Sequence, residues 1–245
     1  MSDESSTTGR TGATGTATTL PSIPDDRDPD VSFVVPARNE ADYLRETLES
    51  LVALDTDYVY EVLVVDGDSS DATPAIAREY GATVRQEGGS SIAAARNLGA
   101  DSADGEWLAF VDADTRVRPD YLTELVGFTE REGLAAASSY CRITGPYRAK
   151  LMEATINHLF SRLERPILPG FNTLVHRRAF EEVGGFPDVS NEDTAFSRRL
   201  ARRYPTAYRR EVLVDSSGRR IADSGLTGTV WHYARLDVDR LRATG

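Results

Sequence analysis

Two aspartates, Asp112 and Asp114, directly follow the short apolar run at residues 107–111. Side chains two residues apart in an extended segment point to the same face, so the pattern predicts that both carboxylates face one small volume. Like charges held together favour a bound cation, and oxygen ligands suit a hard divalent ion such as Mg²⁺ or Mn²⁺. Two carboxylates would leave most of an octahedral shell open for the phosphate oxygens of a ligand. The alternative is that the pair only forms a turn and caps a helix that Pro119 begins.

The elements that would position this pair alternate along the chain. Continuously apolar runs predict buried strands at residues 31–35, 62–65, near 84 and 107–111, and apolar residues at helical spacing predict helices at 44–52, from 72 and at 90–99. Strands that are apolar throughout indicate a mostly parallel sheet with helices on both faces, so we expect an α/β fold with three layers, α/β/α. Ligands of such sheets bind beyond the carboxyl ends of the strands. Polar clusters follow three of these strands, at 36–40, 66–71 and 112–114.

The rest of the chain continues the alternation. Further helices are predicted after Pro119 and at 146–165 and 177–183, and further strands at 134–139 and 171–175. Ser190, followed three residues later by Asp193, predicts a capping box for a helix at 190–204, and residues 212–214 with 220–222 predict a hairpin. Residues 1–30 have the composition of a disordered tail, and 31–245 are expected to form a single domain.

Composition limits the classes of function. Of 245 residues, 39 are acidic and 28 basic, and the formal net charge of -11 argues against a general nucleic-acid binder. Lys150 is the only lysine, and such an acidic, lysine-poor surface resembles proteins of salt-adapted (halophilic) archaea. One cysteine excludes an internal disulfide, no apolar run is long enough to span a bilayer, and no signal peptide is expected. We therefore expect a cytoplasmic protein, with the inner face of the membrane as an alternative location. The helix at 146–165 has a basic amphipathic face that suits peripheral membrane association, and ordinary core packing is the alternative.

Five segments in order resemble the GT-A glycosyltransferases of glycosyltransferase family 2. They are VVPARNE at 34–40, VVDGDSSDAT at 64–73, AARNLGA at 94–100, FVDADT at 110–115 and GGFPDVSNEDTAFSRRL at 184–200. The resemblance implies the GT-A fold, with a nucleotide-binding half at about 31–115 and an acceptor-binding half at about 116–245. It also implies transfer of a sugar from a nucleoside-diphosphate donor, a UDP- or GDP-sugar, with inversion at the anomeric carbon. The implied acceptor is a glycan or a polyprenyl phosphate.

The same resemblance assigns residues to the donor. Positions that would bind the nucleotide-sugar are Pro36, Ala37, Arg38, Glu40, Asp66, Ser69, Asp71, Arg96, Asp112 and Ala113. Asp66 would bind the base, and Arg96 would lie beside the diphosphate, where a guanidinium can bind phosphate oxygens in a bidentate way. Asp112 and Asp114 would hold Mn²⁺ or Mg²⁺, with Asp114 as the direct ligand. Without the resemblance, turn chemistry would explain the 66–71 cluster, and Arg96 would be a surface arginine.

A catalytic base is also implied. Inversion in one displacement needs a group that takes the proton of the acceptor hydroxyl, and Asp193 matches the family position, with Glu192 supporting it or binding acceptor. The capping box would compete with this role, because backbone hydrogen bonds would lower the pKa of Asp193. His232 could be a third metal ligand or a packed histidine, and His158 and His176 are read as structural.

Three other classes of protein fit less well. A sugar-phosphate nucleotidyltransferase would need an early glycine-rich loop with a basic pair, and a dinucleotide oxidoreductase would need G-x-G-x-x-G after the first strand. Pro36-Ala37-Arg38 provides neither. A non-catalytic sugar-nucleotide binder is opposed only by the presence of Asp112, Asp114 and Asp193.

Overall fold

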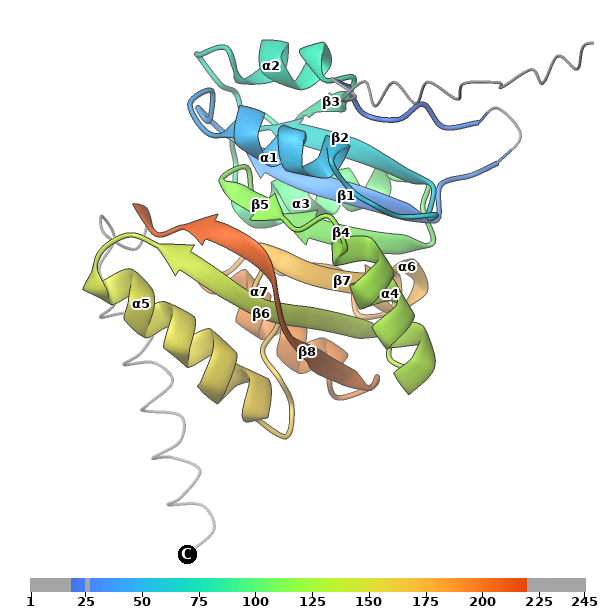
Figure 1. Ribbon diagram of the computed structural model, residues 1–245, viewed down its shortest axis with the longest axis vertical. Helices are drawn as coiled ribbons and strands as arrows, with labels where there is room; N and C mark the ends of the chain where they lie inside the picture. Colours follow the sequence, from blue (N-terminus) through green and yellow to red (C-terminus); the bar gives the residue numbers. More distant parts are fainter. Residues whose placement is uncertain (1–18, 25–26, 220–245) are drawn as a thin grey trace, which may run out of the picture.

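A computed structural model describes residues 19–24 and 27–219, and in them eight strands form one sheet (Figure 1). The order across the sheet is β3-β2-β1-β4-β7-β6-β8-β5. The strands are β1 Val31–Ala37, β2 Tyr60–Asp66, β3 Thr83–Gln86, β4 Trp107–Val111, β5 Thr115–Val117, β6 Ala136–Thr144, β7 Asn172–His176 and β8 Thr206–Ser217. Strands β3, β2, β1 and β4 are parallel, as is the pair β6 and β8, whereas β7 is antiparallel to β4 and β6, and β5 to β8.

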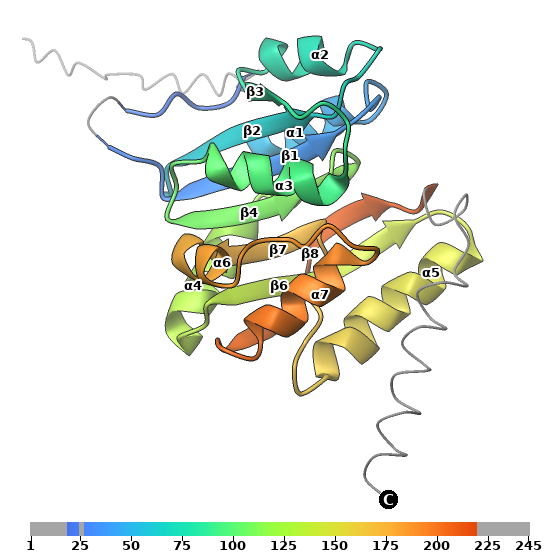
Figure 2. The same cartoon turned by 180° about the vertical axis from the view of Figure 1, so that it is seen from behind.

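Helices cover both faces of this sheet. They are α1 Leu44–Val52, α2 Thr73–Glu79, α3 Ile92–Asp101, α4 Tyr121–Glu132, α5 Tyr147–Ala154, α6 Arg177–Glu182 and α7 Glu192–Leu200, with a π-helical turn η1 Thr155–Leu159 and a 3₁₀ turn η2 Phe160–Arg162 that continue α5. Helices α1 and α4 lie on the face seen in Figure 1, and α3, α6 and α7 lie on the opposite face, seen in Figure 2. The predicted three-layer α/β fold is confirmed, and the wholly parallel part of the sheet is its first half.

The apolar runs explain why the first strands form the centre of the molecule. All seven residues of β1 and all five of β4 are buried, as expected of parallel strands that are covered on both faces. Helix α3 packs closely on β1 and β2, because a Cβ atom at Gly99 would lie 2.3 Å from Val34 Cγ1 and 3.0 Å from Val65 Cγ2. The small residues of this helix allow that close approach.

One local prediction was wrong, one is confirmed with a change of helix type, and one falls partly outside the described residues. Helix α7 begins at Glu192 after Asn191, whose φ of 60° is left-handed, and Asn191, the N-cap, makes no side-chain cap hydrogen bond, so the predicted capping box at Ser190 does not form. The predicted helical stretch at 146–165 is confirmed over 147–162, where α5 continues through a π turn and then a 3₁₀ turn. Residues 212–214 belong to the long strand β8, which pairs with β6 and β5, while the other arm of the predicted hairpin, 220–222, lies outside the described residues.

Parts of the predicted N-terminal tail are described and contact the core. The backbone N–H of Leu20 donates to the carbonyl of Tyr80 at 3.0 Å, and its side chain packs against the core. Residues 1–18 and 25–26 lie outside the described residues. Within the described ranges, no helix has the length and apolar character needed to cross a bilayer.

Candidate functional site

The loops after β1 and β2 are joined by hydrogen bonds between their residues. The Asn39 N–H donates to Ser69 Oγ at 2.9 Å, and the Ser70 N–H donates to Asn39 Oδ1 at 2.8 Å. Asp71 accepts from the Ala41 N–H at 3.1 Å, and the Glu40 N–H donates to the hydroxyl of the residue that begins α2. Hydrogen bonds from short polar side chains thus hold together the loops that contain the predicted polar clusters at 36–40 and 66–71.

Asp66 and Asp71 differ in how they are used within this pair of loops. Asp66 is buried, its Oδ2 accepts from the Ser69 N–H at 3.2 Å, and no partner for its Oδ1 is found in the described part of the chain. Burial would raise the pKa of Asp71, but hydrogen bonds from Thr73 and Ala41 outweigh it and lower that pKa. Asp71 is therefore engaged in holding the loops, as is Ser69, whereas Asp66 keeps one oxygen for another donor.

A cavity of about 370 Å³ opens beside these loops. Four of the predicted donor-binding positions line it, together with the end of β3 and the beginning of α3. The lining residues are Pro36, Ala37, Arg38, Glu40, Gly67, Glu87, Gly89, Ser90, Ser91, Ile92 and Ala95. The Ser91 Oγ accepts from the Ala94 N–H at 3.1 Å and caps α3, so that the positive end of this helix dipole meets the cavity wall.

The aspartate pair lies in a turn, which corrects the extended geometry expected for it. Strand β4 ends at Val111, and the Thr115 N–H donates to the Asp112 carbonyl at 3.0 Å. The side chain of Ala113 is buried, and its carbonyl accepts from Thr47 Oγ1 at 2.8 Å. Because the segment is not extended, the argument from alternating faces does not apply, and the two carboxylates contact different arginines.

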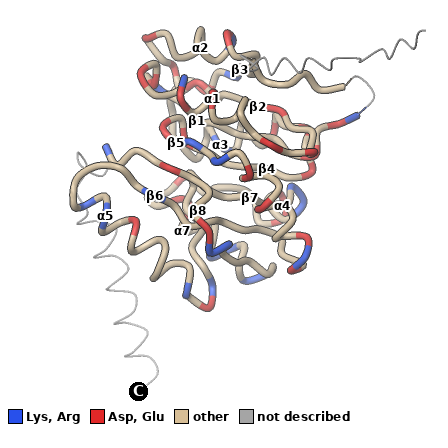
Figure 3. Tube along the Cα trace, in the orientation of Figure 1, with Lys and Arg blue, Asp and Glu red and all other residues tan. Residues whose placement is uncertain are grey.

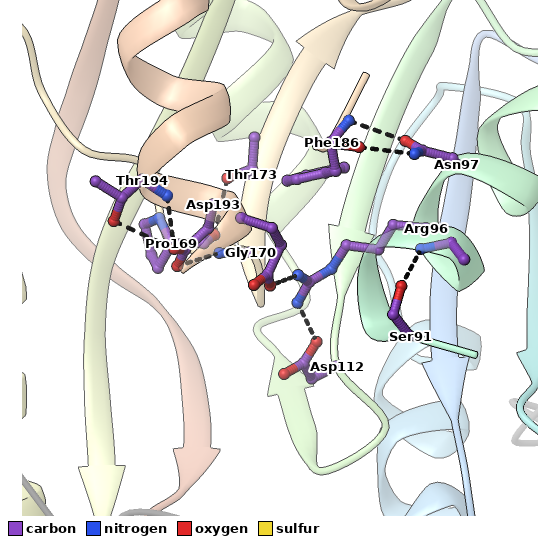
Figure 4. A network of polar contacts seen from close by, with 12 residues as sticks. Ser91, Arg96, Asn97, Asp112, Pro169, Gly170, Thr173, Phe186, Asp193 and Thr194 are labelled. Carbon is purple, nitrogen blue, oxygen red and sulfur yellow. Dashed lines mark hydrogen bonds and ion pairs between the residues drawn. The ribbon is translucent and has the colours of Figure 1, made fainter. Parts of the chain in front are cut away.

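Arg96 is the centre of a buried polar network that joins the two parts of the sheet (Figure 4). Its guanidinium donates to Asp112 Oδ1 at 2.9 Å and to Glu192 Oε1 at 2.6 Å, and its side chain is only 3% exposed. Burial alone would lower the pKa of Arg96, but the charges of Asp112, Glu192 and Asp193 raise it. The interpretation of Arg96 as a surface arginine is therefore wrong, and its ionised form links β4 to the beginning of α7.

Asp193 lies at the first turn of α7 beside this network. Its Oδ1 accepts from the Thr194 N–H at 2.6 Å, and its Oδ2 accepts from the Gly170 N–H at 3.4 Å (Figure 4). Burial and the charge of Glu192 raise its pKa, and the opposing effects of Arg96 and the two backbone hydrogen bonds are weaker. Backbone hydrogen bonds to this carboxylate thus do exist, as the competing interpretation supposed, but its pKa is raised rather than lowered.

Arg219 is a further residue of the site that the sequence did not indicate. Its Nε lies 3.3 Å from Asp114 Oδ2, its Nη2 contacts Glu40 Oε2, and its guanidinium lies 3.9 Å from the centre of the Tyr43 ring. Arg219 thereby connects the end of β8 to the loops after β1 and β4. No local pattern marks it, since it is one of two consecutive arginines after a polar stretch and its partner Glu40 is 179 residues away in sequence.

The donor set of Asp112 and Asp114 fits a hard divalent cation. Both offer carboxylate oxygens, and two guanidinium groups compensate their charge in this structure, which is the role that a cation would take. In the described residues, no three acidic, histidine or cysteine side chains gather into a metal cluster. His232 lies outside the described residues. His158 lies on η1 beside the ring of Tyr140, and His176 pairs with Trp107, at the other end of β4 from Asp112.

Comparison with known proteins agrees with this geometry. The model of the family described as Glycosyl transferase family 2 matches residues 32–184, which is more than half of the chain and contains the loops, Arg96 and both aspartates. The chain belongs to glycosyl transferase family 2.

Two curated relatives illustrate the extent of the similarity. Succinoglycan biosynthesis protein ExoO of Rhizobium meliloti is 37% identical over 116 residues, which cover 46% of this chain and 33% of ExoO. Glycosyltransferase AglE of Haloferax volcanii is 30% identical over 196 residues, which cover 70% of this chain and 61% of AglE. This family 2 chain thus spans less than two thirds of the length of either relative.

Solved structures confirm the GT-A fold. Mannosyltransferase PcManGT of Pyrobaculum calidifontis, in complex with GDP-Man and Mn²⁺, has a TM-score of 0.62 and 26% identity, over 78% of this chain and 57% of that one. Residues 1–349 of S. aureus TarS, in complex with UDP-GlcNAc, have a TM-score of 0.64 and 20% identity, over 77% of this chain and 58% of TarS.

Proposed function

We propose that this family 2 protein transfers a sugar from a UDP- or GDP-sugar to a hydroxyl or lipid-phosphate acceptor, with inversion at the anomeric carbon. The observation that carries the proposal is the contact of one buried guanidinium, Arg96, with both Asp112 and Glu192. Arg96 thus joins Asp112, which is assigned to the donor side, to Glu192, which is assigned with Asp193 to the acceptor side. The complexes of PcManGT with GDP-Man and of TarS with UDP-GlcNAc support a nucleotide-sugar as the donor.

The donor would bind in the cavity between the β1 and β2 loops and the beginning of α3. Asp66 supports this, because a buried carboxylate oxygen without a partner in the described residues is suited to accept from an N–H of the base. Arg38 lines the cavity and would be available to the phosphates, as would the capped end of α3. Ser69 and Asp71 would act indirectly, by fixing the loops.

Charge develops on the diphosphate as the sugar leaves, and this chain has two means to compensate it. Arg96 is a permanently charged donor that needs no reorganisation, because its partners already fix it. Asp112 and Asp114 would hold Mn²⁺ or Mg²⁺, which would supply further positive charge against the leaving group.

Asp193 would accept the proton of the acceptor hydroxyl. In the single displacement, the new bond from the acceptor oxygen to the anomeric carbon forms as the bond to the diphosphate breaks, and the proton passes to the carboxylate. A raised pKa suits this task, because a base works best when its pKa approaches the working pH. Glu192 would keep that pKa raised and would also hold Arg96.

The test is Asp193→Asn, with the exposed Asp188→Asn as a control from the same region. We expect Asp193→Asn to bind nucleoside diphosphate as the wild type does and to lose transfer by roughly 10²- to 10⁴-fold, the usual contribution of a positioned base. Binding is measured by calorimetry, and transfer by release of nucleoside diphosphate with acceptor present. An active Asp193→Asn would remove Asp193 from the role of base. A wild type that binds donors in a thermal-shift screen but never releases nucleoside diphosphate would be a non-catalytic binder.

A further inference from the structure

Helix α5 and its continuation through η1 and η2 expose large apolar side chains on their outer face. Five large apolar side chains are exposed in the described part of the chain, and three of them, Tyr147, Leu151 and Leu159, lie on this segment. Tyr147 is 82% exposed. Their spacing of four and eight residues, with the exposed Ala154 between, sets them on one stripe of the helix.

The opposite face fixes the orientation of this stripe. The Asn157 side chain accepts from the Cys141 N–H at 3.0 Å and donates to the Cys141 carbonyl at 2.7 Å, on strand β6. Glu153 accepts from the Ile143 N–H of the same strand at 2.6 Å. With Ile156 and Phe160 also buried, the helix cannot turn its apolar stripe inward without breaking these contacts.

Basic residues flank the stripe in a protein that is otherwise acidic. Residues 147–165 contain four cations and two acidic residues, whereas the whole chain has a net charge of -11. Figure 3 shows these cations near both ends of the segment; they are Arg148, Lys150, Arg162 and Arg165. All four are exposed at the same surface as the apolar stripe; Lys150 also contacts Glu153 at 2.9 Å, whereas an ion pair is not found for the three arginines within the described residues.

We propose that this face, defined by Tyr147, Leu151, Leu159 and the four flanking cations, docks the protein onto the surface of an anionic phospholipid bilayer. A helix that lies in the interface buries such a stripe among the acyl chains and keeps its basic residues at the headgroups. Arginine and lysine residues near an anionic surface are attracted to it, and each adds to the binding. The proposal goes beyond sugar transfer and does not depend on it.

A second copy of the chain fits this face less well. A two-fold contact would set the same cations of both copies against one another, and like charges across an interface are unfavourable. A stable dimer also needs about 800 Å² of each partner, more than one helical stripe with three large apolar side chains offers. An anionic bilayer has a charge opposite to that of the four cations, and its apolar interior can accommodate a single helical stripe.

The position of α5 gives the docking a consequence. Helix α5 begins shortly after β6 ends at Thr144, and the Thr144 carbonyl accepts from the Gly218 N–H at 2.8 Å. Arg219, which follows Gly218 in the chain, contacts Asp114. The end of the docking face is therefore close in the fold to the candidate donor site. A docked protein would hold that site near the headgroups, where a lipid-linked acceptor is found.

The experiment measures partition of the full chain onto vesicles of phosphatidylcholine alone and of an equimolar mixture with phosphatidylglycerol. We expect binding to the anionic vesicles, reduced at least tenfold in the double variant Leu151→Ser/Leu159→Ser and in Arg148→Ala/Arg162→Ala. Val189→Ser removes an equally exposed apolar side chain elsewhere, and Arg178→Ala an exposed charge on α6, so both should bind as the wild type does. Absence of wild-type binding, or equal binding by the Leu151/Leu159 variant, would overturn the proposal.

A fluorescent label on the stripe distinguishes a bilayer from two other possible occupants of this face, another part of the chain and a second copy. Ala154→Cys can be labelled selectively, because Cys141 is buried and burial raises its pKa to about 12. The label should report water in the free protein and an apolar medium with anionic vesicles, whereas a label at Val189→Cys should not respond. An apolar signal before vesicles are added would mean that another part of the chain covers the face. A signal that instead rises with protein concentration would mean a second copy, and either result overturns the proposal. Unchanged thermal unfolding of each variant verifies its fold.

Discussion

Asp193 lies between opposing influences, since burial and Glu192 raise its pKa while Arg96 and two backbone hydrogen bonds lower it. A base must be ionised to accept a proton, so transfer is expected to fall as pH decreases through this pKa. Because the pKa is raised, the loss should occur above the range of an ordinary aspartate, which titrates at about 3.9.

Glu192→Gln tests that balance, because it removes the nearest negative charge and keeps the shape of the side chain. The pKa of Asp193 should decrease, and the acid limb of the kcat profile should move to lower pH, whatever the height of the profile becomes. The measurement is kcat against pH, with the exposed Glu181→Gln as the control. An acid limb that stays in place would mean that Asp193 is not the group that titrates.

Arg219 permits a second test at the same scale. A divalent cation at Asp114 has to replace this guanidinium, so Arg219→Ala should bind Mn²⁺ in the absence of nucleotide more tightly than the wild type. Charge-assisted hydrogen bonds contribute about 1.5–3 kcal/mol, so a gain of roughly 10- to 150-fold is expected. Calorimetric titration with Mn²⁺ measures it.

Arg209 is a matched control for that measurement. It also lies on β8, contacts two carboxylates, Glu124 and Glu211, and has its guanidinium 5.9 Å from an aromatic ring centre. Arg209→Ala should leave Mn²⁺ affinity unchanged. Weaker binding by Arg219→Ala would show instead that Arg219 keeps the carboxylates in an arrangement that the metal needs.

At the scale of the element, the packing of α3 decides where Arg96 lies. A Cβ at Gly99 would meet Val34 at 2.3 Å and Val65 at 3.0 Å, both in strands that cannot move aside. Gly99→Ala should therefore destabilise the protein by about 1–3 kcal/mol, although alanine favours a helix by about 1 kcal/mol.

Gly127→Ala in α4 is the matched control, because there the new Cβ meets only the flexible end of Arg131. Its free energy of unfolding should rise or stay the same. Urea denaturation of both variants measures the difference. Equal effects at the two glycines would contradict the close contact of α3 with β1 and β2.

The elements also show what could be predicted from the sequence. Strand β4 matches the prediction at both ends, because a continuous apolar run between polar residues defines a buried strand locally. A turn at the aspartate pair was only the alternative interpretation, and the sequence could not decide for it, since the turn leads into β5, whose partner β8 is about a hundred residues away: Thr115 pairs with Ser216. Arg96 and Glu192 were each indicated by family-like segments, but only folding reveals that they contact each other.

At the scale of the whole molecule, charge is the dominant feature. A net charge of -11 produces self-repulsion that opposes the compact state, whereas exposed ion pairs such as Arg178 with Glu182 each contribute only about 0–1 kcal/mol. Salt weakens both the repulsion and the ion pairs, but the loss of repulsion is larger, because repulsion involves many more pairs of charges. Added salt should therefore stabilise this protein, as expected from its acidic, lysine-poor composition.

The measurement is Tm in KCl from low concentration to about 1 M, where the Debye length falls to about 3 Å. Screening predicts a steep rise that flattens once the Debye length is shorter than the spacing of surface charges, while exclusion of solute from the surface would continue to rise linearly. Asp120→Asn/Glu132→Gln, at exposed positions, should raise Tm at low salt and reduce its dependence on KCl. A Tm that falls with KCl would mean that attractive pairs outweigh the net repulsion, and the acidic surface would then need an explanation other than salt.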